Sequence, residues 1–168
     1  MRRYELALIR RVVSQLSEVI ETSRLLMTAD RGFADVQLFS LLQELNVEFI
    51  IRVKASTKVY VPVGGQWRGL GTLRFSGNSR RRNLGHLLYC ANSPQRLWIT
   101  MSRARNRKGG WGVWYLVSNC PHQAGSAAQE YGRRFGCEEG FRDVKWWLGF
   151  KEARVTCIHA WSRLFALF

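Results

Sequence analysis

The chain has 168 residues, 46% of them hydrophobic, which is enough for one folded domain with a core. Lysine and arginine number 26 against 12 acidic residues, so the formal charge of +14 attracts polyanions. Nucleic acid is the favoured partner and an anionic membrane surface is the alternative. No run approaches the roughly 18 to 20 uncharged apolar residues of a spanning helix. Residues 1–25 also lack the compact apolar block of a signal peptide, so we expect a cytoplasmic protein.

Scattered cysteines and histidines argue against a zinc site. Neither residue type shows the paired close spacing that zinc ligands require. We therefore interpret all seven as structural residues, with the cysteines as free thiols in a reducing compartment. They are Cys90, Cys120, Cys137, Cys157, His86, His122 and His159.

The first 54 residues alternate helical and strand patterns. Apolar residues recur at steps of three and four from Tyr4 to Ile20, which predicts an amphipathic helix. A short buried strand is predicted at Leu25–Ala29 and ends in an acidic turn at Asp30. A second helix, Asp35–Leu45, and a second buried strand, Val47–Val53, follow. Strand, helix and strand with short links indicate a parallel crossover unit.

Residues 55–119 are rich in glycine, aromatic and β-branched residues, which predicts several short antiparallel strands. Two basic loops interrupt them. Between Asn78 and Lys108 there are eight basic residues and no acidic one. Either loop alone is equally well explained as a solvated surface turn. Together with the neighbouring aromatic residues, they favour nucleic-acid contact. The loop residues are Arg80, Arg81, Arg82, Arg103, Arg105, Arg107 and Lys108.

A long helix is predicted at Ser126–Leu148, followed by an amphipathic segment at Ala153–Phe168. Four polar residues of the helix project from one face, within an arc of roughly 60° at about 100° per residue. They are Tyr131, Arg134, Glu138 and Lys145. A carboxylate between cations on one stripe suits a metal ion beside phosphates. The alternative is a solvent face with ordinary ion pairs between residues one turn apart.

The spacing of these four residues resembles that of bacterial insertion-sequence transposases of family four, whose signature is Tyr-x2-Arg-x3-Glu-x6-Lys. The flanking residues Glu139, Phe141, Arg142 and Asp143 also match that family. A second match is the Asp-Arg-Gly-Phe turn at residues 30–33, which follows an apolar strand, as the second catalytic aspartate does in these enzymes. One departure is Phe135, where the family often has tryptophan.

The resemblance implies a DDE transposase that cleaves and joins DNA strands with Mg²⁺ or Mn²⁺. Asp30 and Glu138 would be two of three catalytic carboxylates and metal ligands. Tyr131, Arg134 and Lys145 would grip phosphates near the transposon end. Trp114 or Trp111 would stack a flipped base, with packing in a strand as the alternative role for either. The implied location is the bacterial nucleoid, and the implied partners are transposon-end and target DNA.

The implied fold is α/β and ribonuclease-H-like, with a β-rich insertion between the second Asp and the Glu helix. Residues 1–54 would be part of the core, 55–119 the basic insertion and 120–168 the catalytic helix with a following helix. The three antiparallel strands and first catalytic Asp of that fold have no counterpart before Asp30. We therefore expect an N-terminally truncated fragment, inactive alone, whose first strand has an open edge. An N-terminal half of the same transposase would complete it, and a homodimer in a synaptic complex is the other possible protein partner.

Two further hypotheses remain. A catalytically dead remnant would still bind DNA through its basic residues, with an affinity that falls steeply with salt and depends little on Glu138. An RNA-binding domain is less favoured, because the chain has neither a Gly-x-x-Gly clamp nor the aromatic strand motif of RNA-recognition sheets.

Overall fold

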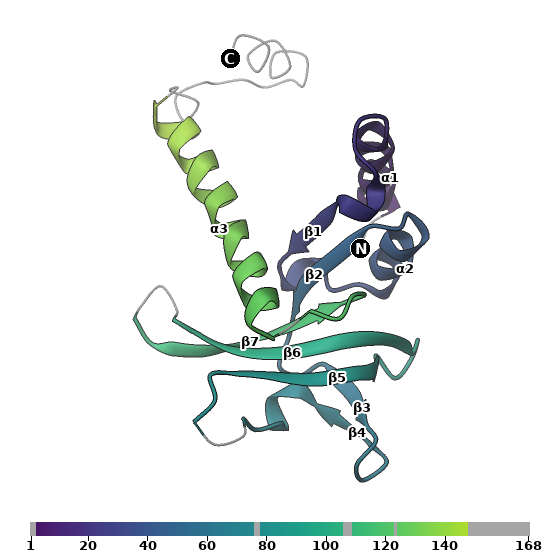
Figure 1. Ribbon diagram of the computed structural model, residues 1–168, viewed down its shortest axis with the longest axis vertical. Coiled ribbons are helices and arrows are strands. Elements are labelled where there is room, and N and C mark those ends of the chain that lie inside the picture. Colours follow the sequence, from purple (N-terminus) through teal and green to yellow (C-terminus); the bar gives the residue numbers. More distant parts are fainter. Residues whose placement is uncertain (1–2, 76–77, 106–108, 123, 148–168) are drawn as a thin grey trace. The chain divides into compact units, whose positions relative to one another are not determined.

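A computed structural model describes residues 3–75, 78–105, 109–122 and 124–147 of the chain (Figure 1). The chain divides into two compact units, residues 1–132 and residues 133–168, and each is described by itself. The first unit contains a seven-stranded sheet with the strand order β1-β2-β7-β6-β5-β3-β4. The last described helix, α3 (Ala124–Trp147), begins in the first unit and continues into the second.

The first half of the sheet is the predicted parallel crossover. Helix α1 (Arg3–Ser17) leads through a short 3₁₀ turn into β1 (Leu26–Ala29). Helix α2 (Val36–Glu44) then connects β1 to β2 (Glu48–Val53). The two strands are parallel and in register from Leu26 opposite Glu48 to Ala29 opposite Ile51, which confirms the predicted connection. Asp35 caps α2, because its side chain accepts a hydrogen bond from the Gln37 amide at 2.8 Å.

The β-rich segment forms the rest of the same sheet. A hairpin of β3 (Lys58–Val61) and β4 (Gln66–Gly69) precedes three longer antiparallel strands. These are β5 (Arg81–Tyr89), β6 (Gln95–Arg105) and β7 (Trp111–Ser118). Strand β7 then pairs antiparallel with β2, so the segment after residue 54 extends the first sheet directly. Antiparallel strands were predicted here, but their joining to β2 was not.

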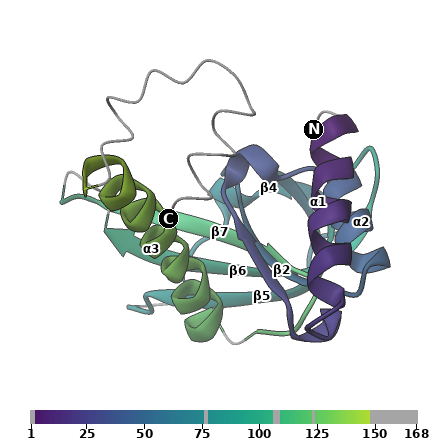
Figure 2. The same ribbon diagram turned by 90° about the horizontal axis from the view of Figure 1, so that it is seen from above.

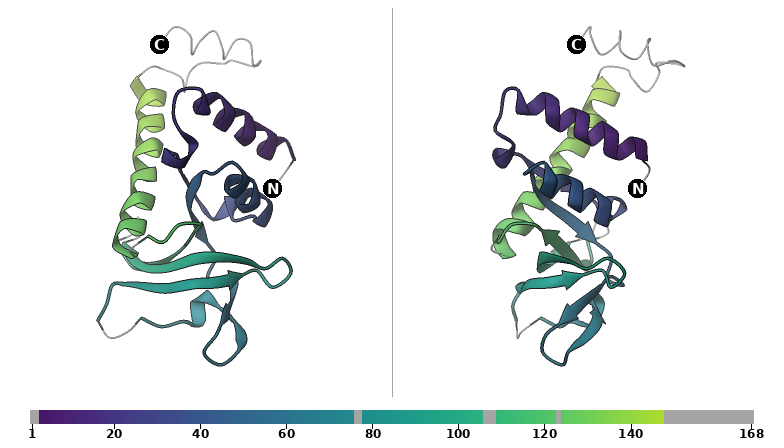
Figure 3. Two further views of the ribbon diagram at one scale, coloured as in Figure 1. Left: turned by 45° about the vertical axis from the view of Figure 1, so that its right-hand side comes forward. Right: turned by 90° about the vertical axis from the view of Figure 1, so that its right-hand side faces the viewer.

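Helices α1 and α2 contact each other and cover one face of the sheet, as the views in Figures 2 and 3 show. The core lies beneath them. Phe39 of α2 stacks on Phe49 of β2 with ring centroids 5.1 Å apart, and both side chains are fully buried. The same face continues across the antiparallel strands through Val117, Ile99 and Leu97. Burial of this apolar face is the main driving force that holds the sheet to the helices.

The first turns of α3 cover the opposite face of the sheet. The Tyr131 ring meets Trp114 of β7 edge-on at 5.0 Å, and both Ala127 and Ala128 are buried. At Gly125 a Cβ atom would lie 3.0 Å from the Arg81 guanidinium, so glycine permits this close approach. Asn83 of β5 also donates a hydrogen bond to the His122 carbonyl just before the helix.

The second unit is described as far as residue 147. Within it α3 continues to Trp147, with the Arg134 guanidinium 4.9 Å from the ring of Phe135. Arg142 and Asp143 form an exposed ion pair at 3.8 Å. The predicted amphipathic segment Ala153–Phe168 lies outside the described residues.

Candidate functional site

The sheet topology brings the predicted site residues of the first unit to one edge. Strands β1 and β2 are parallel, so both end at the same edge, and Asp30 follows the end of β1. Because β7, β6 and β5 alternate in direction, the starts of β5 and β7 and the end of β6 lie at this edge as well. The described residues of the two basic loops lie at these strand ends. We call this side of the sheet the Asp30 edge.

Asp30 is positioned by the turn that follows β1. Its Oδ1 atom accepts a hydrogen bond from the Gly32 amide at 2.8 Å, which fixes the carboxylate beside its own backbone. A Cβ atom on residue 32 would lie 3.1 Å from the same oxygen, so glycine leaves room for this turn. The Asp30 side chain is half-buried. An oxygen ligand of this kind suits Mg²⁺, although among the described residues no three His, Cys, Asp or Glu side chains form a metal-binding group.

Arginine and aromatic side chains form a cluster at the ends of β5, β6 and β7. The guanidinium carbons of Arg80 and Arg105 lie 5.4 and 5.7 Å from the centre of the Trp111 ring, within cation–π range. Arg103 lies 5.0 Å from the ring of Phe75. We call these five residues the Arg-Trp cluster. Trp111 remains 56% exposed, so part of its surface is accessible to a ligand.

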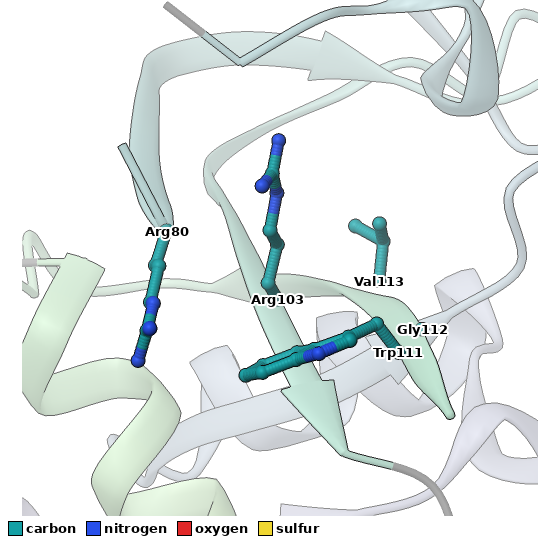
Figure 4. Close-up of a pocket in the computed structure, with 5 residues that line it drawn as sticks. All are labelled: Arg80, Arg103, Trp111, Gly112 and Val113. Carbon is teal, nitrogen blue, oxygen red and sulfur yellow. The ribbon is translucent and has the colours of Figure 1, made fainter. Parts of the chain in front are cut away.

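Two adjoining cavities open at the Arg-Trp cluster. One has a volume of about 380 Å³ and is lined by Arg80, Arg103, Trp111, Gly112 and Val113 (Figure 4). The other, of about 470 Å³, extends along Ser79 and Arg81 to Arg105. In Figure 4 the indole of Trp111 extends toward the Arg80 side chain, and the Arg103 side chain points away from the ring. A planar aromatic floor with guanidinium groups around it can hold a base and its phosphate together.

The electrostatic setting of the Arg-Trp cluster is strongly positive. From Phe49 to Gln129 the sequence has thirteen lysines and arginines and no aspartate or glutamate. The cluster therefore has no acidic neighbour from its own segment to neutralise it. Arg82 is held at the rim, since its guanidinium donates to the Arg74 carbonyl. A partner with many negative charges is attracted here before any specific contact forms.

Tyr131 was expected to contact a phosphate and Trp114 to stack on a base. In the structure the two rings pack against each other. Tyr131 is fully buried, and its ring packs against Trp114. The physical reason is the crossing of α3 over the sheet, which turns this side of the helix inward at Tyr131. Trp111, three residues before Trp114 on the same strand, is the exposed aromatic residue of the pair. The structure thus shows that Trp114 packs against α3 and that Trp111 is accessible to a ligand. The sequence did not distinguish these two roles.

The remaining predicted residues lie on α3 or in an undescribed loop. Arg134, Glu138 and Lys145 all lie in α3, which confirms the predicted helix. They belong to the second unit, whereas Asp30 belongs to the first. Arg107 and Lys108 of the second basic loop lie outside the described residues. Phe75 was missed from sequence, although an aromatic residue directly after Arg74 in an acid-free stretch is a usable signal.

A family model for the transposase DDE domain matches residues 2–167. The match covers almost the whole chain. This chain belongs to the DDE transposase domain family. Its predicted fold class is confirmed: the mixed α/β sheet is consistent with the ribonuclease-H-like transposase domain. DDE transposases act on DNA and generally use divalent metal ions. A comparison with curated proteins gives no match. In the part of the chain that the structure describes, no helix is both long and apolar enough to span a bilayer.

Proposed function

We propose that this DDE transposase domain is of the insertion-sequence family four type and acts in strand cleavage and transfer at transposon ends. The observation that carries the proposal is the Asp30 edge, where a half-buried carboxylate and the Arg-Trp cluster lie at the same end of the strands. The Tyr131-to-Lys145 spacing on one continuous helix supports the family assignment.

Asp30 and Glu138 are the proposed metal ligands, and Mg²⁺ or Mn²⁺ is the proposed ion. When bound, such an ion activates the attacking oxygen and stabilises the leaving oxygen of a displacement at phosphorus. The Asp30 carboxylate is held in place by the Gly32 amide, so it needs little reorganisation to accept a cation. Arg134 and Lys145 are the proposed phosphate contacts on α3. Tyr131 is assigned a positioning role, since its burial against Trp114 fixes the helix to the sheet.

The Arg-Trp cluster is the proposed DNA-contact surface near the transposon end. Arginine side chains neutralise phosphates, and the accessible face of Trp111 suits an unpaired base. Arg81 and Arg82 flank the cluster and extend its positive surface. Arg107 and Lys108 belong by sequence to the same basic loop as Arg103 and Arg105, and for that reason we include them in the proposed DNA-contact surface.

The open side of β1 is the proposed docking site for the N-terminal part of a transposase. Strand β1 ends the sheet, and among the described strands it pairs with β2 alone. Helix α1 carries an exposed apolar row of Tyr4, Leu8, Val12 and Leu16, in addition to the side that packs in the core. Apolar surface of this extent, beside an unpaired strand, is typical of an interface. A strand-bearing segment with the first catalytic Asp fits both features.

Magnesium-dependent nicking of transposon-end DNA tests the proposal. The chain by itself is expected to give no nicking, and addition of the product of an upstream reading frame is expected to restore it. Asp30→Asn and Glu138→Gln should each abolish the restored activity while DNA binding remains. Nicking by the chain alone contradicts the proposed fragment, and restored activity that survives Asp30→Asn contradicts the catalytic assignment.

The alternative function is a DNA-binding remnant without catalysis, which the acid-free surface is sufficient to support. Binding that is strong, salt-sensitive and unaffected by Glu138→Gln, with no nicking under any complementation, would favour it. Loss of binding on Glu138→Gln would count against it.

A further inference from the structure

The β3–β4 hairpin extends beyond the strand that anchors it. Four residue pairs join β3 to β4, from Lys58 opposite Gly69 to Val61 opposite Gln66. Only Val59 and Tyr60 pair with β5, so the outer half of the hairpin has no strand beside β3 among the described residues. Figure 1 shows the hairpin projecting from the sheet. It forms a short arm with an apolar base, where Val59 is fully buried.

The tip of this arm is a tight turn with an apolar residue at its end. The Gly65 amide donates to the Pro62 carbonyl at 3.1 Å, which closes the turn. Gly64 has φ of 93° and Gly65 has φ of 57°, and both angles favour glycine. This backbone presents Val63 with 85% of its surface exposed, more than any other large hydrophobic residue described. A protein gains nothing in folding stability from a valine so exposed.

The hairpin that carries the exposed Val63 also carries positively charged side chains. Lys58 and Arg68 are exposed on the hairpin, and the whole arm lies in the acid-free stretch from Phe49 to Gln129. With the Gln66 amide oxygen turned toward Arg68, that oxygen accepts from Arg68 Nε at 2.9 Å, which holds the guanidinium near the turn. An apolar tip with cations behind it fits a polyanion with a narrow apolar-walled groove. Duplex DNA has both features in its minor groove.

We propose that the β3–β4 hairpin contacts duplex DNA, with Val63 entering the minor groove and Arg68 and Lys58 on the adjacent phosphates. The inference rests on the proposed DNA substrate and adds a second contact, separate from the Arg-Trp cluster. Apolar side chains that enter the minor groove partly unstack a base step and bend the duplex. The hairpin therefore contributes to DNA deformation, and its cations contribute to affinity.

Bending and binding of a mixed-sequence duplex test the inference on the full chain. Val63→Thr keeps the β-branched shape but replaces a methyl group with a hydroxyl. The expected result is a smaller bend, measured by energy transfer between dyes at the two duplex ends, with binding retained. Arg68→Gln is expected to weaken binding severalfold and to lower the slope of log affinity against log salt by about one. Val19→Thr is the matched control, because Val19 is 79% exposed in a segment without excess positive charge.

The duplex bend and the salt slope of the variants distinguish the proposed hairpin contact from its alternatives. A bend reduced by Val63→Thr but not by Val19→Thr supports the hairpin contact. Wild-type binding with an unchanged bend in Val63→Thr and an unchanged salt slope in Arg68→Gln overturns it while leaving the proposed function intact. A wild-type chain that binds no DNA overturns both. A Val63→Thr chain with altered self-association but normal DNA bending overturns the DNA contact in favour of a protein contact.

Discussion

Residues 1–48 and residues 49–129 lie in one sheet but carry very different charge. The first segment has six basic and seven acidic residues, and the second has thirteen basic residues and no acidic one. We refer to them as the balanced segment and the acid-free segment. The balanced segment supplies both helices over the core, and the acid-free segment supplies the Arg-Trp cluster. Both segments contribute buried residues to the core, whereas the Arg-Trp cluster belongs to the acid-free segment alone.

The largest expected effect on stability comes from the buried core beneath α2. Phe39→Ala removes a fully buried ring that stacks on Phe49, and should lower the free energy of unfolding by about 3–5 kcal/mol. Urea denaturation followed by circular dichroism measures this change. Trp111→Ala is the control, since it removes an exposed aromatic residue from the acid-free segment. An equal loss in both variants would remove the distinction between the buried core and the exposed Arg-Trp cluster.

DNA binding should depend on which segment loses positive charge. The triple variant Arg80→Ala, Arg103→Ala and Arg105→Ala is expected to lower the salt slope of duplex binding by roughly 2.7, at about 0.9 for each phosphate that is no longer neutralised. Fluorescence anisotropy at several salt concentrations measures the slope. The control replaces Arg3, Arg11 and Arg24 of the balanced segment with alanine, which changes net charge equally. The comparison fails if the slope falls by the same amount in both triple variants.

Trp111 should matter more for unpaired bases than for duplex. Trp111→Ala is expected to weaken binding of a single-stranded oligonucleotide by about 1–3 kcal/mol, the range for one stacked base. Titration calorimetry gives this value, and Trp111→Phe should recover most of it. Because Trp111 is exposed, thermal unfolding should change little. Equal weakening of duplex and single-strand binding would argue against base stacking.

A smaller effect is expected on the reactivity of Cys120. This residue of the acid-free segment lies beside Glu48 of the balanced segment. Burial, together with Glu48, raises the pKa of the Cys120 thiol to about 11. At pH 8 only about one thiol in a thousand is then ionised, so alkylation of Cys120 should be slow. Glu48→Gln should lower this pKa and speed the reaction, as followed by mass spectrometry of the Cys120 peptide. Denatured protein provides the rapid reference, and fast native labelling would contradict the raised pKa.

The raised pKa of Cys120 also makes the free energy of unfolding depend on pH. The folded pKa of Cys120 lies above the value of about 8.5 for an unfolded thiol. Its contribution to stability is therefore fully present below the unfolded pKa and is lost as pH rises toward 11. The wild-type melting temperature should fall over this alkaline range. A Cys120→Ala chain, which has no thiol to ionise at this position, should show a shallower decline.

The smallest expected effect comes from an exposed ion pair between α1 and α2. Arg10 donates to both carboxylate oxygens of Glu44, at 3.1 and 2.9 Å. These hydrogen bonds lower the pKa of Glu44, so the pair stabilises above the unfolded pKa of a glutamate and is lost as pH falls through the folded one. Arg10→Ala should shift the melting temperature slightly at pH 7 and not at low pH. A large shift would mean that α1 depends on this pair more than on its buried apolar side.

The sequence by itself determined the charge separation, the parallel crossover and the long helix. These follow from local signals: acid-free composition, periods of three and four in helices, and short apolar runs with capping residues such as Asp35. The Asp-Arg-Gly-Phe turn also lies directly after its strand, as its residues predict, because Gly32 leaves room for the Asp30 carboxylate. Local spacing suffices where the partners are neighbours in the chain.

Only the tertiary structure decided which of these residues meet. Register between β2, β7, β6 and β5 brings Asp30 and the described arginines of the basic loops to one edge, and strand pairing between residues so far apart in the chain has no local sequence signal. The sequence did not distinguish Trp111 from Trp114. In the structure Trp114 packs against Tyr131 of α3, whereas Trp111 is exposed. Burial depends on what the rest of the chain places against a side chain. The chemistry of the site was therefore readable from residue types, and its assembly was not.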